Sequence, residues 1–293
     1  MSDNFSHANE PRVLLEGLAM PESPRWHDGR LWFSNWGAEE IIAVDLDGKA
    51  EVVDRGPEGL GWAVNWLPDG RMLITGSELV RVEPDGSRVR HADLSHISPY
   101  GWSEMTIDGR GNVYVNTINF DFADFGTVLA SVQAPGKIAL VTPDGDVREV
   151  ASEIAFPNGM VITPDNKTLI ISESFAARLT AFDIAADGTL SNRRVWADDV
   201  GPDGICLDAE GCIWASSGAM INDCARIREG GQVAEKFELD RPCFAAMLGG
   251  PDRRSLFMLT AEWHGTDGVE DVIKARTGQI LVVDAPADGV GWP

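Results

Sequence analysis

The sequence is short of cysteine, of basic residues and of long apolar runs. Its four cysteines form no Cys-x-x-Cys pair, which argues against a structural zinc site and is typical of free thiols in a cytoplasmic protein. Lysine and arginine total 24 against 46 acidic residues, so the net charge is −22 and the surface would repel nucleic acid. No apolar run is long enough to span a membrane, and the polar N-terminus has no signal-peptide core. We therefore expect a cytoplasmic protein without nucleic-acid or membrane partners.

What the sequence does contain is a recurring turn signal. Each turn combines aspartate with glycine, proline or asparagine, and successive turns lie roughly 40 residues apart. One longer step contains an insertion at residues 120–135. The turns begin at Asp28, Asp69, Asp108, Pro164, Asp208 and Pro251.

Strand-like runs follow each turn, and most units contain about four of them. Six such units predict an all-β, six-bladed β-propeller. The last unit ends near Val283, so we expect a strand at residues 13–16 to complete it and close the ring. A β-sandwich or β-helix is the alternative, but six similar units make it less favourable. We expect one domain over residues 12–293, preceded by a flexible tail at residues 1–11.

The first strand of each propeller blade lines the central channel, so residues of equal rank form a ring. The ring position lies about seven or eight residues before each turn glycine or its equivalent. Three of the residues at this position are hard oxygen donors. They favour Ca²⁺, with Mg²⁺, Mn²⁺ or Zn²⁺ as alternatives, although the absence of histidine and cysteine argues against a site built for zinc. The same residues could instead cap channel strands and hold ordered water. The ring positions are Glu22, Trp62, Ser103, Asn158, Asp203, and Ala246 or Phe244.

Around these positions the chain resembles the gluconolactonase, senescence-marker-protein and luciferin-regenerating-enzyme family, over about residues 12–284. The resemblance implies a six-bladed propeller with one divalent ion in its channel, and mostly lactonase activity; related propellers hydrolyse organophosphates. It also implies Glu22, Asn158 and Asp203 as metal ligands, with Asp203 as the catalytic carboxylate. The matching stretches are Pro21-Glu22-Ser23-Pro24-Arg25-Trp26, Phe156-Pro157-Asn158-Gly159-Met160, Thr163-Pro164-Asp165, Gly201-Pro202-Asp203-Gly204 and Leu248-Gly249-Gly250-Pro251-Asp252.

The third blade departs from the family pattern. Ser103 and Glu104 stand where the family usually has Asn-Asp, and Gly101 stands where some sugar lactonases carry arginine. A serine hydroxyl is a shorter and weaker ligand than an asparagine amide, so we expect water to fill the gap. Both departures weaken the case for a sugar lactone.

The predicted function is metal-dependent hydrolysis of a lactone or carboxylic ester. The ion would polarise the carbonyl, and Asp203 would act as general base or nucleophile. An aromatic mouth favours an apolar or aromatic substrate, unless the aromatics fill the space between blades and His264 is merely solvated. The alternatives are a metal-stabilised binding propeller, organophosphate hydrolysis, or a metal-assisted rearrangement. The expected substrate contacts are Ser103, Glu104, Trp36, Trp62, Trp102, Phe156, Phe244, Trp263 and His264.

The insertion at residues 120–135 contains three phenylalanines, Phe120, Phe122 and Phe125. Exposed aromatic rings favour burial. We therefore expect the insertion to form a lid over the channel, the alternative being a surface loop without a role.

Overall fold

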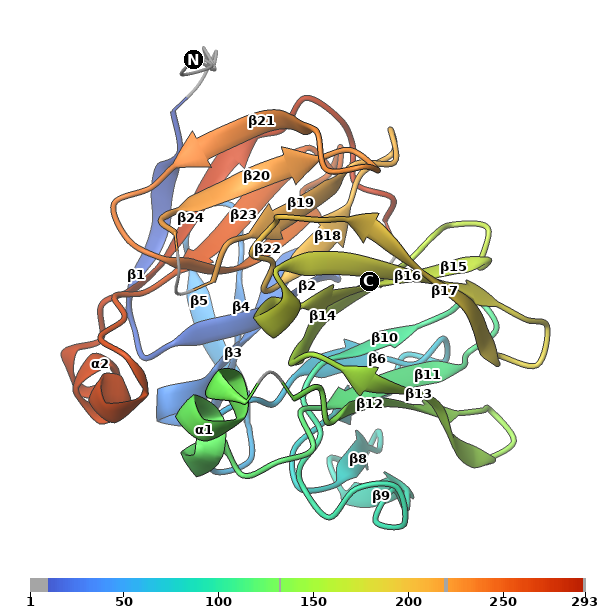
Figure 1. Cartoon of the computed structure of the whole chain (residues 1–293). Coiled ribbons are helices and arrows are strands. Elements are labelled where there is room, and N and C mark those ends of the chain that lie inside the picture. The colour runs from blue at the N-terminus through green and yellow to red at the C-terminus, as the bar shows by residue number, and fades with distance from the viewer. Residues whose placement is uncertain (1–9, 132, 219–220, 292–293) are drawn as a thin grey trace.

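The computed structural model describes residues 10–131, 133–218 and 221–291, which form six four-stranded antiparallel sheets (Figure 1). The predicted tail at residues 1–11 lies outside the described residues except for Glu10 and Pro11. The first three sheets contain β2 (Pro21–His27), β3 (Arg30–Asn35), β4 (Glu40–Val44) and β5 (Ala50–Arg55); β6 (Val64–Trp66), β7 (Met72–Ile74), β8 (Leu79–Val82) and β9 (Arg88–Ala92); and β10 (Met105–Ile107), β11 (Val113–Thr117), β12 (Gly136–Val141) and β13 (Val147–Ile154).

The remaining sheets follow the same order along the chain, and the last one recruits a strand from the other end. They contain β14 (Pro157–Ile162), β15 (Thr168–Glu173), β16 (Arg178–Ile184) and β17 (Leu190–Ala197); β18 (Ile205–Leu207), β19 (Ile213–Ser216), β20 (Asp223–Ile227) and β21 (Val233–Glu238); and β22 (Cys243–Gly249), β23 (Ser255–Thr260), β24 (Gly278–Asp284) and β1 (Arg12–Leu18).

The ring closes as the sequence predicts. β1 pairs antiparallel with β24, and Val13 lies opposite Leu281. The innermost strands β2, β6, β10, β14, β18 and β22 each contact the next one, and β22 contacts β2 again. The molecule is therefore a six-bladed propeller whose first strands surround a central channel.

The tight turns between the first two strands of each blade need a left-handed residue. Glycine supplies it in four blades, for example Gly29 with φ of 73° and Gly211 with φ of 78°, and Asn166 and Arg253 supply it in the fourth and sixth. The apolar cores lie between neighbouring blades; Leu179 of the fourth blade and Ile213 of the fifth share one such core. This arrangement leaves the channel itself for polar side chains.

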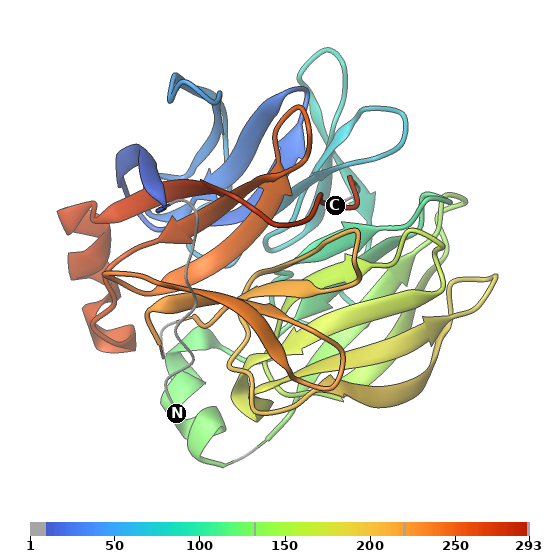
Figure 2. The same ribbon diagram turned by 90° about the horizontal axis from the view of Figure 1, so that it is seen from above.

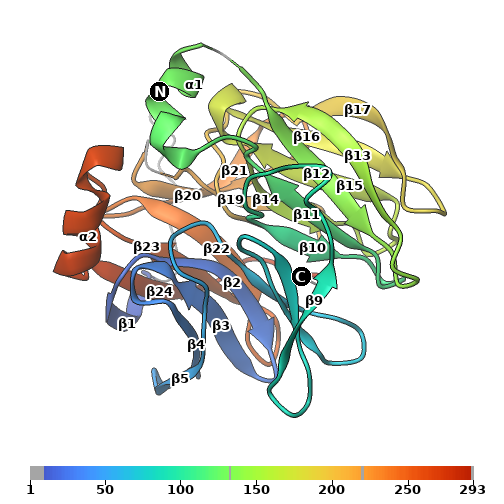
Figure 3. The same ribbon diagram turned by 90° about the horizontal axis from the view of Figure 1, so that it is seen from below.

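Two short helices interrupt the β-structure, and both lie on the same side of the molecule (Figures 1, 2 and 3). The insertion at residues 120–135 forms η2 (Phe122–Asp124) and α1 (Phe125–Ala130). A second insertion, which the sequence analysis did not separate from the sixth blade, forms η4 (Thr266–Gly268) and α2 (Val269–Ala275). Single 3₁₀ turns follow β3 and β15 as η1 (Trp36–Ala38) and η3 (Ser174–Ala176). None of the helices in the described part of the chain could cross a membrane.

The C-terminal segment closes the opposite end of the channel. Ala209 N donates to Asp288 O at 2.7 Å, and Gly289 N donates to Arg253 O at 2.7 Å. Val290 packs against the core between the fourth and fifth blades. Above this segment, a cavity of only ≈ 20 Å³ remains between the innermost strands, so the candidate site opens towards the side that carries α1 and α2.

A buried ion-pair network stabilises the fourth blade where β15 ends and β16 begins. The side chain of Glu173 is fully buried and lies 3.0 Å from both Arg178 and Arg193. Burial alone would raise the pKa of Glu173, but hydrogen bonds from Ala155 and Thr180 and the charges of the two arginines lower it below 4.5. The ion pairs therefore stabilise the folded state while Glu173 is ionised.

We expect Glu173→Gln to lower the free energy of unfolding by about 2 kcal/mol at pH 7, since two partly hydrated guanidinium groups lose their buried partner. Because the folded-state pKa lies below the unfolded value, this stability is present above about pH 4.5 and is lost as the pH falls through the folded value. Urea unfolding at pH 7 and at pH 4 measures the difference. The exposed pair of Glu149 with Lys137 is the control, and Glu149→Gln should cost less than about 1 kcal/mol.

Candidate active site

The three predicted metal ligands converge on the channel from three blades. Glu22 is the second residue of β2, Asn158 is the second residue of β14, and Asp203 lies two residues before β18. The Asn158 amide donates a hydrogen bond to the Asp203 carboxylate, and the charge of Asp203 acts on Glu22. The structure therefore brings together all three side chains that the sequence selects by their rank.

Glycine follows two of these residues because the innermost strands come very close there. Gly159 N donates to Asp203 O at 3.2 Å, and Gly204 N donates to a carbonyl of the sixth blade at 2.8 Å. A Cβ at Gly159 would lie 2.7 Å from the backbone nitrogen of Ile205, and one at Gly204 would lie 2.6 Å from Ala245. The Asn-Gly and Asp-Gly pairs thus fix the two candidate ligand residues where neighbouring blades meet.

A third glycine leaves room for the Asp203 carboxylate. Gly218 has φ of 52°, and a Cβ there would lie 2.8 Å from Asp203 Oδ2. The other carboxylate oxygen, Oδ1, is buried and accepts no hydrogen bond from the described residues. A buried carboxylate oxygen without a donor is costly unless a cation or an ordered water binds it.

Burial and repulsion between carboxylates together set the electrostatics of the channel. Burial, and then the charge of Glu104, raise the pKa of Asp203 to about 8, although the hydrogen bond from Asn158 lowers it. Burial and the charges of Asp203 and Glu104 raise the pKa of Glu22 well above its ordinary value. A divalent cation at this point would remove the repulsion.

These residues fit a divalent cation. If Glu22, Glu104 and Asp203 are all ionised, the cluster contains three carboxylates and one guanidinium group, that of Arg25. Two negative charges then remain without a partner, and a divalent ion would balance them. Neither in the channel nor elsewhere do the described residues contain a group of three or more His, Cys, Asp or Glu side chains arranged around a metal position. The centre would accordingly combine two carboxylates with the Asn158 amide, which is an oxygen-only set suited to a hard cation.

The third-blade residues Ser103 and Glu104 both reach this region, in different ways. Ser103 is partly exposed, and its backbone is held by hydrogen bonds from Ser103 N to Asn116 O at 2.8 Å and from Thr75 Oγ1 to Ser103 O at 2.5 Å. Glu104 is 8 % exposed and pairs with Arg25 at 3.1 Å. Ser103 is thus available to solvent or substrate, whereas Glu104 belongs to a buried polar network.

The predicted aromatic contacts fall into two groups. Trp62 and Trp102 are only 1 % and 2 % exposed and belong to the cores on either side of the second blade. A Cβ at Gly56 would lie 2.2 Å from the Trp62 ring, so this glycine makes space for the indole. The side chains of these two tryptophans therefore pack between blades.

Phe156 lies directly before the Asn158 strand and anchors the insertion that the sequence analysis describes as a lid. Its ring stacks on Phe175 with centroids 4.5 Å apart, and Phe125 of α1 contacts both rings edge-on at 5.4 and 5.0 Å. Phe120 lies 6.1 Å from Phe156. Aromatic packing therefore holds the insertion against the upper end of the fourth blade.

A second aromatic cluster forms around α2. Phe244 is 4 % exposed and packs with Val272 of α2, and the partly buried Trp36 and Trp263 cover the same cluster. His264 lies outside it: its side chain is 61 % exposed, and its Nε2 is 3.6 Å from Glu262. Trp36 and Trp263 are thus the members of this cluster that retain a surface for a ligand, and His264 faces solvent.

Sequence reasoning did not select Ser23, Arg25, Phe175 or Gly218 as site residues. Ser23 and Arg25 stand inside the stretch that carries the family resemblance, so their position next to Glu22 was the available signal. Phe175 and Gly218 stand outside the matched stretches, and only the fold brings them to the site.

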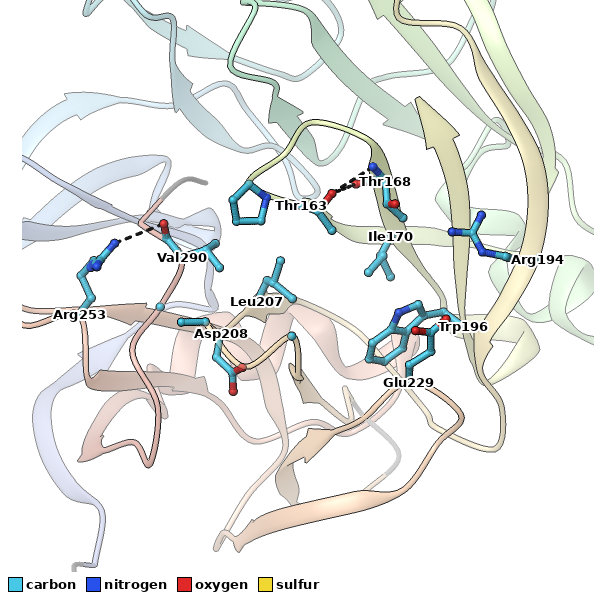
Figure 4. A pocket seen from close by; sticks show the side chains of 14 residues that line it. Thr163, Thr168, Ile170, Arg194, Trp196, Leu207, Asp208, Glu229, Arg253 and Val290 are labelled. Carbon is cyan, nitrogen blue, oxygen red and sulfur yellow. Dashed lines mark hydrogen bonds between the residues drawn. The ribbon is translucent and has the colours of Figure 1, made fainter. Parts of the chain in front are cut away.

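A larger pocket, of ≈ 470 Å³, lies between the fourth and fifth blades, at the end opposite to α1 and α2 (Figure 4). It is lined by the two turns that end β14 and β18, among them Thr163 and Asp208, and Val290 of the C-terminal segment borders it. Asp208 is five residues beyond Asp203, or about 16 Å along a strand. This pocket is therefore separate from the channel carboxylates and is not the candidate site.

Known proteins resemble this chain over nearly its whole length. The chain is 30 % identical over 281 residues to regucalcin from Xenopus laevis, which covers 91 % of this chain and 90 % of that protein. It is 28 % identical over 296 residues to pentonolactonase XacC from Haloferax volcanii, covering 95 % of each chain. A solved structure of a calcium-binding protein, regucalcin, from Agrobacterium tumefaciens has a TM-score of 0.77 at 21 % identity, and covers 99 % of this chain and 97 % of that one.

The family model described as the SMP-30/gluconolactonase/LRE-like region matches residues 20–262. This span contains the first five blades and the two inner strands of the sixth, β22 and β23, together with all three candidate ligands. The chain belongs to the SMP-30/gluconolactonase/LRE-like family.

Proposed function

We propose that the protein is a divalent-metal-dependent hydrolase of a lactone or carboxylic ester. The observation that carries this proposal is the convergence of Glu22, Asn158 and Asp203 in the channel, with a buried Asp203 oxygen that no described donor satisfies. Membership of a family with lactonase relatives supports the same reaction class.

Glu22, Asn158 and Asp203 would hold the ion, and Ca²⁺ suits their carboxylate and amide oxygens best. When bound, the ion would polarise the substrate carbonyl and stabilise the oxyanion that develops during attack. The calcium-binding protein among the structural neighbours supports Ca²⁺ as the first ion to test.

Asp203 is the residue that we propose to act on the nucleophile. In one route Asp203 accepts the proton of a water that attacks the carbonyl carbon, and it passes this proton to the alcohol oxygen as the ester C–O bond breaks. In the other route Asp203 attacks the carbonyl carbon itself, the alcohol leaves with a proton from water, and a second water hydrolyses the resulting acyl anhydride to restore the carboxylate. A single turnover in ¹⁸O-labelled water distinguishes the routes. Water that attacks the substrate carbonyl places the label in the product acid, whereas hydrolysis of a covalent intermediate at the carboxyl carbon of Asp203 places the label in the protein.

The substrate that we propose is apolar or aromatic. Phe156, Trp36 and Trp263 are partly exposed near the end of the channel that carries α1 and α2. Gly101 contributes no guanidinium group that could bind the hydroxyl groups of a sugar acid. A small acyl or aryl ring would bury apolar area against these rings.

Hydrolysis of a lactone panel tests the proposal. The panel contains aromatic lactones, sugar lactones and an aryl organophosphate, each assayed with EDTA and then with Ca²⁺, Mn²⁺ or Zn²⁺ restored. The proposal expects turnover of aromatic lactones that EDTA removes and Ca²⁺ restores. Turnover of sugar lactones alone would contradict the apolar substrate, and turnover of none, with a cation still bound, would favour a binding propeller.

A further inference from the structure

Ser23 adopts a backbone conformation that serine rarely uses. Its φ is 52°, and the residue is 1 % exposed. A left-handed residue other than glycine or asparagine is strained, and such strain persists where the surroundings enforce it, often at functional sites. Glycine would fit here without strain, so the serine side chain needs a separate explanation.

The hydrogen bonds of Ser23 supply that explanation. Its backbone nitrogen donates to Glu22 Oε2 at 2.6 Å, and its hydroxyl donates to Glu104 Oε1. The hydroxyl also lies 3.5 Å from the carbonyl oxygen of Trp62. One strained residue thus connects two carboxylates that reach the channel from different blades.

Arg25 holds the same carboxylate from the other side. Its Nη2 donates to Glu104 Oε2 at 3.1 Å and to Met105 O at 2.8 Å, and its Nη1 donates to Pro24 O at 2.8 Å. The side chains of Arg25 and Glu104 are 11 % and 10 % exposed. Both oxygens of Glu104 consequently accept hydrogen bonds from protein donors, so Glu104 is poorly placed to be a direct metal ligand.

We propose that Ser23 and Arg25 are positioning residues that fix Glu104 beside Glu22 and Asp203, so that Glu104 adds its negative charge to the cation centre without binding the ion directly. This inference rests on the proposed function, because it takes the channel to be a cation centre. Glu104, which stands where the family usually has aspartate, would then strengthen cation binding by electrostatic attraction without contact. A charge held close by in a low-dielectric channel acts strongly.

Two substitutions separate the hydroxyl of Ser23 from its backbone strain. Ser23→Gly removes the hydroxyl and relieves the strain, whereas Ser23→Ala removes the hydroxyl and keeps the strain. Calorimetric titration of each purified full-length variant with CaCl₂ measures cation affinity, and thermal unfolding without cation measures stability. We expect both variants to bind Ca²⁺ about tenfold more weakly than the wild type, since each loses a hydrogen bond to a charged group. Ser23→Gly should unfold roughly 2–4 °C above Ser23→Ala.

Coupling to Glu104 completes the test. Glu104→Gln should weaken Ca²⁺ binding by about tenfold or more, and adding Ser23→Gly to it should weaken binding no further. Arg25→Lys keeps the positive charge but only one point of contact with Glu104, so it should weaken Ca²⁺ binding through lost positioning and not through a change in net charge. Asp199→Gly is the matched control, because Asp199 is exposed and also left-handed, with φ of 55°; it should leave cation affinity unchanged.

The failures are distinguishable. If the wild type binds Ca²⁺ and the Ser23 variants bind it equally well or more tightly, the positioning role is wrong and the cation centre stands. If Ser23→Gly and Glu104→Gln weaken binding additively, the two residues act separately and the inference is also wrong. If the wild type binds no divalent cation, the proposed function fails and this inference fails with it.

Discussion

Asp203→Asn is expected to lower kcat/KM for lactone hydrolysis by about a thousandfold or more, even with saturating Ca²⁺. Asparagine keeps the size of the side chain and one oxygen for the cation, but it can neither accept a proton from water nor attack the carbonyl. General-base or nucleophilic assistance of this kind contributes about 10²–10⁴-fold. The measurement is steady-state hydrolysis of the best lactone from the panel at increasing CaCl₂.

The folded state should tolerate this substitution. The Asp203 carboxylate is buried beside Glu22 and Glu104, so replacing it removes a like-charge repulsion and leaves the cation-free protein at least as stable. Thermal unfolding in EDTA checks this point. Asp252→Asn, in the exposed turn of the sixth blade, is the matched control and should keep full activity. Activity of Asp203→Asn within tenfold of the wild type would remove Asp203 from the chemistry.

Glu22→Gln should produce a different defect. In the proposed reaction, Glu22 would contribute charge and an oxygen to the cation centre but would not handle a proton. We expect Ca²⁺ affinity to fall by about a hundredfold or more, since even indirect partners of metal ligands change affinity by about 10–100-fold. Turnover should return towards the wild-type kcat once CaCl₂ is raised enough to refill the site, as activity measured against CaCl₂ concentration would show.

Glu22→Gln and Asp203→Asn should respond differently to excess Ca²⁺. Rescue of the first by excess Ca²⁺ and not of the second separates a ligand from the residue that acts on the nucleophile. Equal rescue of both would make Asp203 a ligand only, and failure to rescue either would assign Glu22 a part in the chemistry itself.

The fold could be predicted from sequence because its turns are local. Each tight turn needs a left-handed residue, so glycine, asparagine or a substitute recurs once per blade, as at Gly29 and Asn166. The spacing then fixes the rank of the channel residues. Glu22, Asn158 and Asp203 emerge from this rank alone, and the glycines after Asn158 and Asp203 meet the close approach of neighbouring strands.

Rank could not predict the orientation of the aromatic residues. Trp62 shares the rank of Glu22, yet β6 begins only at Val64, and the indole turns between the first two blades, where it is 1 % exposed. Burying a large apolar ring there gains more than leaving it in a polar channel. The helix α2 was missed for a related reason: Val269, Val272 and Ile273 have helical spacing, but over seven residues that pattern is too short to distinguish from a loop.

The polar network around Glu104 depends on contacts that sequence does not contain. Ser23 and Arg25 lie about 80 positions before Glu104 in the chain, and only the closing of the ring of blades brings them together. Local propensity even argues against serine at a left-handed position. The network is visible only when the three-dimensional partners of that serine are known.

We propose that Glu22, Asn158 and Asp203 bind one divalent cation in the channel. The most direct test is a crystal grown with MnCl₂ and measured at the manganese absorption edge. We expect one strong anomalous peak about 2.1–2.6 Å from oxygens of all three side chains, and we expect Glu22→Gln to weaken or abolish it at the same MnCl₂ concentration. A channel without a peak, or a peak bound by other residues while the channel carboxylates bond only to water, would contradict the proposal.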